Sequence, residues 1–540
     1  MSILTLIPGG SIPLPPGSLL SFAKQLGAAL AMAEGGSVSV VTKAYMEEVL
    51  GEGSAVALEL SYGRGRASAW LSSVEECARF TILVAENAPS PAADSRTSLP
   101  LQSQQKNASN EEGGDPFLNW ARLCTQHSDV VLVVGEGGGH PAFGRLESTL
   151  LFSPQGGAMH LARVDLVLLH APNTPPSGTR AWFSSQYSSA MVANPSSIKQ
   201  QGMASSLTST TPPTAAAAAA TWTRGITHHH HVRQGCQVEM EGDIARLARI
   251  LTGRAVGVVL GGGGSRGLAH LGLLRELHSR GIPIDCIGGA SQGCFMAAAW
   301  AISENLESME AKVAALSDSV GSTLNIIRAL TLPLVSLTSG AHFDDIIRSG
   351  LGCVQIEDIP GPRFFAVSLN ATDGALAVHA VGPLWRYVRA SMSVIKLLPP
   401  VFDRETKRLL VDGGYVSNLP VDVLHALFPG TVGLVFACDV ENKDSTANWL
   451  DIRESDYGLG DSLELSGWWV AWRALLSFLR LGPPMRMPYT DDLFLQVSYM
   501  MHYSRLRALL SEEGYDGAMK EREEEEGEEE GGGEGGGGTG

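Results

Sequence analysis

A glycine-rich run after an apolar segment is the feature that most constrains how this chain folds. Six of the seven residues from Gly261 to Gly267 are glycine or serine, and the apolar residues 258–260 precede them. Glycine loses more conformational freedom on folding than any other residue, so this cluster indicates a loop whose bare backbone approaches a ligand or a reacting group. The helical pattern LAHLGLLRELHSRG covers the end of the loop and the residues after it, which predicts a strand–loop–helix unit of an α/β fold.

Two kinds of site need such a loop. Gly262, Gly264 and Gly267 match the dinucleotide fingerprint G-x-G-x-x-G, and Asp285 follows at about the twenty-residue spacing of its ribose-binding acid. Asp285, however, lies inside the next strand pattern, before the carboxyl end from which it would reach a ribose. The same bare N–H groups also suit an oxyanion hole, which stabilises the tetrahedral intermediate of acyl transfer.

A second motif favours the oxyanion hole. The strand pattern PIDCIGG runs into Gly289-Ala290-Ser291-Gln292-Gly293, and the helical pattern CFMAAAWA follows. G-x-S-x-G between a strand and a helix is typical of a nucleophile elbow, a sharp turn that exposes the serine hydroxyl at a helix N-terminus. The glycine-rich loop ends one strand earlier, so we expect its N–H groups to converge on Ser291. Arg266 either adds positive potential there or holds the loop in shape.

A nucleophilic serine also needs a base. His425 and His502 are late in the chain, but His425 lies in the helix-like stretch PVDVLHALF, where a packing role is expected. Asp412, in RLLVDGGYVSNLP, ends an apolar strand, where α/β enzymes keep functional groups. Asp412 takes the serine proton directly if burial raises its pKa. Alone, Asp-Gly-Gly would indicate only a β-turn.

Composition predicts the domains before this unit. Residues 1–174 alternate apolar runs with helical patterns, which predicts a smaller parallel α/β accessory domain. An insert near 87–115 is rich in Ser, Pro, Ala and Gln and is predicted to be disordered. Residues 175–240 are predicted to be a low-complexity linker, in which the run His228–His231 is a repeat expansion rather than a metal site.

The remaining residues are predicted to form a second α/β region over 241–510, with its core at about 256–426, and a disordered acidic Glu/Gly tail over 511–540. The net charge of -17 is partly local, because residues 521–534 hold nine Glu and one Arg. The rest is mildly acidic and has no basic stripe, which argues against a nucleic-acid partner.

Cysteine usage and hydropathy bear on the compartment. The seven cysteines are scattered and form no C-x-x-C, which indicates reduced thiols in a cytosol-facing protein, and Cys294 is expected to be a core residue. No signal peptide and no spanning apolar run are recognised. The pattern LELSGWWVAWRALLSFLRLG places three tryptophans on one helical face, which fits either a core or a membrane interface.

The order and spacing of G-G-G-G-x-R-G, G-x-S-x-G and D-G-G resemble the patatin-like phospholipases. ARLARILTG, LWRYVRASMSVIKLLPPVFD, VDGGYVSNLP and DSLELSGWW are similar to the neuropathy target esterase branch of that family. SILTLIP and WARLCTQHSDVVLVVGEG resemble the α/β region upstream of its catalytic domain. The resemblance implies a three-layer α/β/α hydrolase domain over the catalytic region, preceded by the smaller parallel domain.

The same resemblance implies a Ser–Asp dyad of Ser291 and Asp412 that hydrolyses carboxylic esters of lysophosphatidylcholine and related phospholipids. The other implied site residues are the oxyanion element Gly262, Gly263, Gly264 and Arg266 and the motif glycines Gly289, Gly293, Gly413 and Gly414. Ala290 and Gln292 replace the Thr and Ile common beside the serine. The alternative is a catalytically silent lipid-binding module.

The resemblance also bears on cofactors and location. It implies no metal and no organic cofactor. The partner it implies is a phospholipid at a membrane surface, with the chain lying peripherally on the cytoplasmic side of the endoplasmic reticulum. The cyclic-nucleotide-binding domains of the family have no counterpart in this sequence, so no nucleotide regulation is expected.

Overall fold

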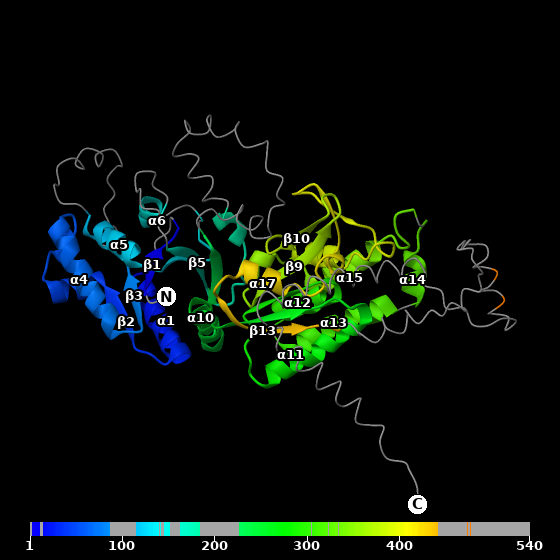
Figure 1. The fold of residues 1–540 in the computed structure, drawn as a ribbon, viewed down its shortest axis with the longest axis horizontal. Coiled ribbons are helices and arrows are strands. Elements are labelled where there is room, and N and C mark those ends of the chain that lie inside the picture. Colours follow the sequence, from blue (N-terminus) through cyan, green and yellow to red (C-terminus); the bar gives the residue numbers. More distant parts are fainter. Residues whose placement is uncertain are drawn as a thin grey trace, which may run out of the picture.

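The computed structural model describes the two predicted α/β units and the contacts between them (Figure 1). The residues it describes are 3–10, 14–86, 115–139, 141, 145–151, 162–183, 226–303, 305–321, 323–332 and 334–440, with 472 and 476. The predicted insert, except Asp115, and the acidic tail lie outside these residues. So does the tryptophan-rich segment, except Trp472 and Leu476.

The N-terminal domain is built on a wholly parallel sheet whose strand order is β2-β3-β1-β4-β5-β6. The strands are β1 (Ile3–Pro8), β2 (Val38–Thr42), β3 (Phe80–Val84), β4 (Val130–Glu136), β5 (Arg163–His170) and β6 (His228–Arg233). Successive residues of a strand face opposite sides, and both sides are apolar here because helices cover both. The predicted parallel sheet is confirmed.

Two helix layers cover this sheet. On one face, α1 (Ser18–Glu34) and α10 (Gln237–Leu251) share a core with Leu4 and Leu6 of β1. On the other, Ile3 and Ile7 meet the remaining helices. These are α2 (Lys43–Leu50), α3 (Ser54–Ala57), α4 (Ser61–Cys77), α5 (Pro116–His127) and α6 (Arg145–Leu150).

The run His228–His231 belongs to strand β6, so the predicted linker over 175–240 is wrong for its described residues. His228, His230 and His231 are buried, and Trp182 and Phe183 also lie in the core. Burial lowers the pKa of His230 to about 3, which leaves a neutral imidazole able to pack in a strand. Repeated histidines look like a linker by composition, although they serve as strand residues once both faces are covered.

The boundary between the domains lies after α10 rather than near residue 241. α10 packs against α1 and β6 of the first sheet. From there it reaches the second domain through Arg249, which makes two hydrogen bonds to Asp285. The predicted start of the second unit is therefore wrong, because an amphipathic helix fits the pattern of either domain.

The second domain has a mixed sheet in the order β11-β12-β9-β8-β7-β13, with β10 paired to β9. β7, β8, β9 and β13 run parallel, and β10, β11 and β12 are antiparallel to their partners. The strands are β7 (Ala255–Leu260), β8 (Cys286–Gly289), β9 (Arg363–Asn370), β10 (Ala375–His379), β11 (Val401–Asp403), β12 (Arg408–Asp412) and β13 (Val432–Cys438).

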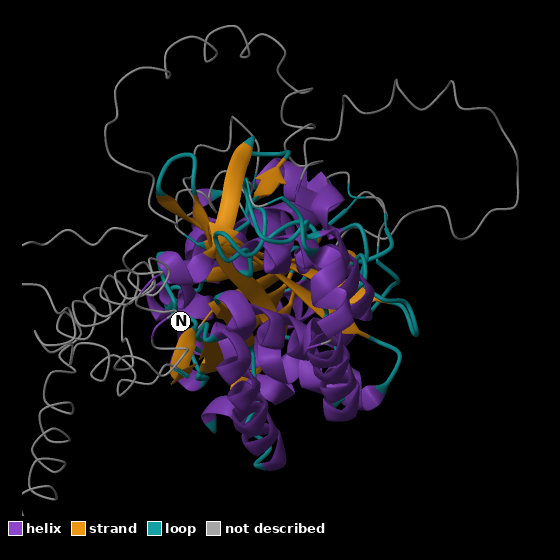
Figure 2. Cartoon of the chain, turned by 90° about the vertical axis from the view of Figure 1, so that its right-hand side faces the viewer, coloured by secondary structure: helices purple, strands orange, loops and turns teal. Residues whose placement is uncertain are grey.

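Helices enclose this sheet on both sides, which gives the predicted three-layer α/β/α architecture (Figure 2). One face packs on α11 (His270–Ser279), α12 (Ser291–Ile302), α13 (Leu306–Gly321), α15 (Ala341–Leu351) and α16 (Leu384–Ser391). The other packs on α17 (Val421–Leu427). The short elements are the 3-10 turns η2 (Gly264–Ala269), η3 (Ile356–Asp358) and η4 (Gly413–Tyr415) and the helix α14 (Thr323–Ala329). No helix within the described ranges is long and apolar enough to cross a bilayer.

Candidate functional site

Ser291 occupies the sharp turn between β8 and α12. Its φ is 50°, in the left-handed region that a residue with a Cβ rarely adopts. Glycine is required on either side, because a Cβ at Gly289 or Gly293 would lie 2.1 Å or 2.2 Å from the Leu260 carbonyl oxygen. The turn has the strained strand-to-helix geometry of a nucleophile elbow.

Asp412 meets Ser291 from the end of β12. The serine Oγ donates to Asp412 Oδ2 at 2.7 Å, and the backbone N–H of Gly414 donates to Asp412 Oδ1 at 2.8 Å. Gly413 lies so close to β9 that a Cβ there would be 2.3 Å from the Val367 carbonyl oxygen. The close packing of the Asp-Gly-Gly turn on β9 therefore positions the Asp412 carboxylate next to Ser291.

Burial adjusts the acidity of this carboxyl. Asp412 is only 4% exposed, and its desolvation raises its pKa from 3.8 to about 7, although hydrogen bonds from Ser291 and Gly414 act in the opposite direction. A carboxylate with a pKa near neutrality is a far better proton acceptor than an ordinary aspartate. Asp412 can thus take the Ser291 proton as the serine oxygen attacks.

The glycine-rich loop lies against the elbow, as its order in the chain suggested. A Cβ at Gly262 would be 3.0 Å from Ser291 Cβ, and one at Gly267 would be 2.4 Å from Cγ of Gln292. Gly264 has a φ of 56°, which favours glycine. The loop is rich in glycine because its backbone packs directly on the residues around the serine.

Asn418, which the sequence did not single out, holds this loop. Its Oδ1 accepts the Gly262 N–H at 3.0 Å, and its Nδ2 donates to the Gly262 carbonyl at 3.1 Å. The Gly262 N–H is therefore occupied and does not point to an oxyanion in this arrangement. Of the predicted oxyanion donors, this leaves the N–H groups of Gly263 and Gly264 to be tested.

Arg266 is exposed at the turn of the loop, where its backbone N–H donates to the Gly263 carbonyl at 3.2 Å. Its side chain makes no ion pair within the described part of the chain. The structure therefore fits both roles expected of Arg266. Its backbone N–H helps to hold the loop in shape, and its exposed guanidinium can add positive potential.

Ser391, at the end of α16, is a second site residue that the sequence did not reveal. Its Oγ accepts the backbone N–H of Ser291 at 3.0 Å, and the residue is fully buried. In the sequence, the stretch RASMSV contributes only to the family resemblance. A contact made across a hundred residues of sequence has no local signal.

The other polar candidates have structural partners. Buried His270 lies 2.8 Å from the Gly261 carbonyl, and buried His379 lies 2.7 Å from Ser368 Oγ. His425 is exposed, so the packing role expected for it is wrong, and His502 lies outside the described residues. Asp285 is paired with Arg249, which leaves no free carboxylate for a ribose.

No metal site is evident in the described residues, and Cys294 does not act as a rival nucleophile to Ser291. No three His, Cys, Asp or Glu side chains cluster there in a way that could hold a metal ion. Cys294 is buried in α12, and desolvation raises the pKa of its thiol far above the ordinary value, which makes it inert. The expected core role of Cys294 is confirmed.

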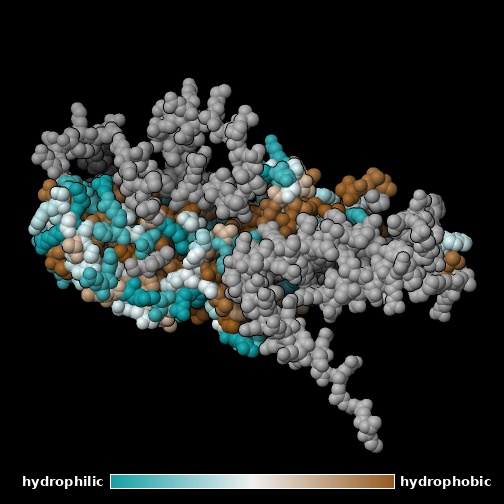
Figure 3. Space-filling view, viewed as in Figure 1, coloured by the Kyte–Doolittle hydropathy of each residue, from teal (hydrophilic) through white to brown (hydrophobic). Residues whose placement is uncertain are grey.

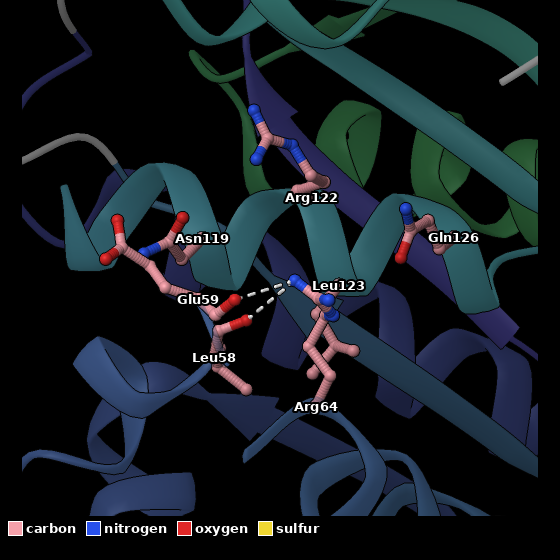
Figure 4. A pocket seen from close by; sticks show the side chains of 7 residues that line it. All are labelled: Leu58, Glu59, Arg64, Asn119, Arg122, Leu123 and Gln126. Atoms are coloured by element: carbon pink, nitrogen blue, oxygen red, sulfur yellow. Dashed lines mark hydrogen bonds between the residues drawn. The ribbon is translucent and has the colours of Figure 1, made fainter. Parts of the chain in front are cut away.

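A separate hollow lies on the N-terminal domain (Figure 4). It contains none of the residues predicted for the site. Arg64 Nη1 is held at its edge by the carbonyls of Glu59 at 3.0 Å and Leu58 at 3.4 Å. The lining residues are Leu58, Glu59, Arg64, Asn119, Arg122, Leu123 and Gln126.

The segment that carries this geometry is that of a known family. Residues 258–425 match the patatin-like phospholipases, and this span contains the glycine-rich loop, the elbow and Asp412. These residues form a patatin-like phospholipase domain. Residues 115–253 match the P-loop like domain of the neuropathy target esterase family, and this match ends just after α10.

Curated relatives of this patatin-like chain agree with both matches. Patatin-like phospholipase domain-containing protein 7 of Rattus norvegicus is 35% identical over 66% of this chain and 24% of its own length. Neuropathy target esterase sws of Drosophila melanogaster is 32% identical over 71% and 24%. Lysophospholipase nte1 of Aspergillus fumigatus is 34% identical over 65% and 22%. The chain thus spans about a quarter of the length of these relatives.

Proposed function

We propose that this chain is a serine esterase that hydrolyses the carboxylic ester bond of phospholipids and lysophospholipids. The observation that carries the proposal is the 2.7 Å hydrogen bond from Ser291 Oγ, on a strained elbow, to the buried carboxylate of Asp412. The match of residues 258–425 to the patatin-like phospholipases supports a lipid ester, and a relative named lysophospholipase supports the narrower substrate class.

In the proposed reaction, Asp412 accepts the Ser291 proton while Oγ attacks the ester carbonyl. The tetrahedral intermediate collapses, the ester C–O bond breaks, and Asp412 returns the proton to the leaving alcohol. Water then attacks the acyl-enzyme with Asp412 again as base, which releases the fatty acid and restores the serine. The raised pKa of Asp412 suits both directions of transfer, because the group is neither strongly acidic nor strongly basic near neutral pH.

The glycine-rich loop and the helix that follows the elbow stabilise the negative charge of the tetrahedral intermediate. The proposed donors are the N–H groups of Gly263 and Gly264, with Gly262 setting the position of the loop through Asn418. The N-terminus of α12, which begins at Ser291, adds its positive dipole end. Arg266 contributes positive potential at the rim.

The proposed setting follows from the substrate. Phospholipids are held in bilayers, so the chain would work at a membrane surface. The resemblance to the neuropathy target esterase branch implies the cytoplasmic face of the endoplasmic reticulum. No organic cofactor is required by the two-residue chemistry.

The test uses a fluorophosphonate probe and lysophosphatidylcholine with the full chain. Wild-type protein should be labelled and should release fatty acid, whereas Ser291→Ala should do neither while keeping its circular dichroism spectrum. Ser265→Ala, an exposed serine of the glycine-rich loop, should keep its labelling. A wild-type protein that folds but neither labels nor hydrolyses would identify a silent lipid-binding module instead.

A further inference from the structure

Eight large apolar side chains stand exposed on two neighbouring segments, here called the apolar lip. They are between 38% and 84% exposed, the most exposed being Leu334. In the hydropathy view the loop after α14, at the upper right of Figure 1, is brown (Figure 3). The lip consists of Ile327, Leu330, Leu332, Leu334, Val335 and Leu337 on the first segment and Ile395 and Leu397 on the second.

Backbone hydrogen bonds join the two segments. Leu337 N–H donates to the Lys396 carbonyl at 2.6 Å, and Thr338 N–H donates to the Leu397 carbonyl at 3.2 Å. Within the second segment, the buried guanidinium of Arg389 donates to Ser393 Oγ at 2.5 Å and to the Pro399 carbonyl at 3.4 Å. The two segments of the lip therefore form one hydrogen-bonded unit.

The second segment is bonded to the catalytic turn on both sides. The Ser393 carbonyl accepts the N–H of Asp412 at 3.0 Å, and Ile395 N–H donates to Tyr415 Oη at 3.0 Å. Ser391, which binds the Ser291 N–H, begins the same stretch of chain. The backbone of the second segment thus links the apolar lip to the proposed dyad.

The charge of the lip differs from that of the chain. Residues 327–340 and 392–401 contain one Arg and one Lys and no acidic residue, in a chain whose net charge is -17. A soluble protein rarely exposes so many neighbouring apolar side chains without a partner for them. Apolar side chains with a few basic residues suit the interface of a bilayer that carries anionic lipid.

We infer that the apolar lip is the surface by which this domain docks on a phospholipid bilayer, with its apolar side chains inserted among the lipids beside Ser291. The inference rests on the proposed function, because it supplies the route by which a lipid reaches the dyad. It places the membrane contact on residues of the patatin-like domain itself.

The test compares the triple variant Leu332→Ser, Leu334→Ser, Val335→Ser with a control double variant Met32→Ser, Val238→Ser. The control side chains are as exposed, at 87% and 76%, but lie on the N-terminal domain. Both sets are made in the Ser291→Ala chain, so that no lipid is consumed. Binding is measured by co-sedimentation with phosphatidylcholine vesicles, with and without phosphatidylserine.

The triple variant should bind vesicles at least about tenfold more weakly than its parent, because three apolar side chains no longer leave water. The control should bind as the parent does. Phosphatidylserine should strengthen binding of the parent, and Leu334→Glu should reverse that gain. Equal binding by the triple variant and its parent would overturn the inference. So would a parent dimer that the triple variant dissociates, since a second copy would then cover the lip.

A second readout separates this inference from the proposed function. With Ser291 intact, the triple variant should lose hydrolysis of vesicle-borne lipid but keep turnover of a water-soluble short-chain ester. Equal loss on both substrates would mean that the lip serves the dyad rather than a membrane, and would overturn the inference. The chain could also bind vesicles through the lip and yet hydrolyse neither substrate. That result would support the docking inference and overturn the proposed function.

Discussion

The side-chain amide of Asn418 makes two hydrogen bonds to Gly262. Its Oδ1 accepts the glycine N–H at 3.0 Å, and its Nδ2 donates to the glycine carbonyl at 3.1 Å. Gly262 in turn lies against Ser291 Cβ. A residue six positions after Asp412 in the chain thus fixes the glycine-rich loop against the nucleophile. Loop, elbow and Asp-Gly-Gly turn form one connected unit.

Asn418→Ala should lower kcat by about tenfold to a hundredfold with little change in KM, because a misplaced loop weakens transition-state contacts more than substrate binding. The measurement is steady-state hydrolysis of a water-soluble ester. The control is Asn370→Ala, which removes another buried Asn, one that closes the β9–β10 turn. If the folded Asn418 variant kept full kcat, Asn418 would be structural only.

The pH dependence of kcat/KM should follow Asp412. The base must be ionised to accept the serine proton, and burial raises its pKa to about 7. Activity should therefore rise about tenfold per pH unit below neutrality and level off above about pH 7. The measurement is kcat/KM for the soluble ester across this range. A profile that stays flat down to about pH 5 would mean that the free carboxyl has an ordinary pKa.

Asp412→Asn should be more stable than the wild type above about pH 7. The folded wild type holds the Asp412 proton more tightly than the unfolded chain does, because the native pKa is about 7 and the ordinary value is 3.8. Wild-type stability from this group is therefore lost as pH rises between these values. The variant should gain on the order of a few kcal/mol at about pH 8 and nothing near pH 4. Thermal melts at both pH values measure this, and a pH-independent difference would contradict it.

Arg249→Leu should lower the free energy of unfolding of the second domain by about 3–5 kcal/mol, because it strands the buried Asp285 carboxylate. Arg249 makes hydrogen bonds of 2.9 Å and 2.6 Å to that carboxylate across the domain boundary. Arg275→Leu, which breaks an exposed pair with Glu310, should leave this free energy nearly unchanged. Urea unfolding measures both variants. An Arg249→Leu variant as stable as the wild type would mean that the Arg249–Asp285 pair adds no stability.

The parts of the fold that were predictable are those with a local signal. Doubly apolar runs such as the one that forms β4 predicted a covered parallel sheet, because burial on both faces removes the alternation of polar residues. The elbow was predictable since strand, small residues and helix follow one another in sequence. The position of Asp412 beside the elbow was predictable because this residue ends its strand.

What could not be predicted depends on contacts between distant segments. Ser391 and Asn418 reach the site across the sheet, and no pattern near either residue marks it. The histidines of β6 look like an expanded repeat until β5 and the second domain cover them. α10 carries one apolar face that suits either domain, so only its packing on α1 assigns it.

The most direct test of the account is the hydrolysis of lysophosphatidylcholine by five single variants whose folding is checked by circular dichroism. Asp412→Asn should lose about 10²–10⁴-fold in rate, because asparagine cannot take the Ser291 proton. His270→Gln, His379→Gln, His425→Gln and His502→Gln should each keep most of the activity. A folded histidine variant as inactive as Asp412→Asn would make this a triad enzyme and contradict the Ser–Asp account.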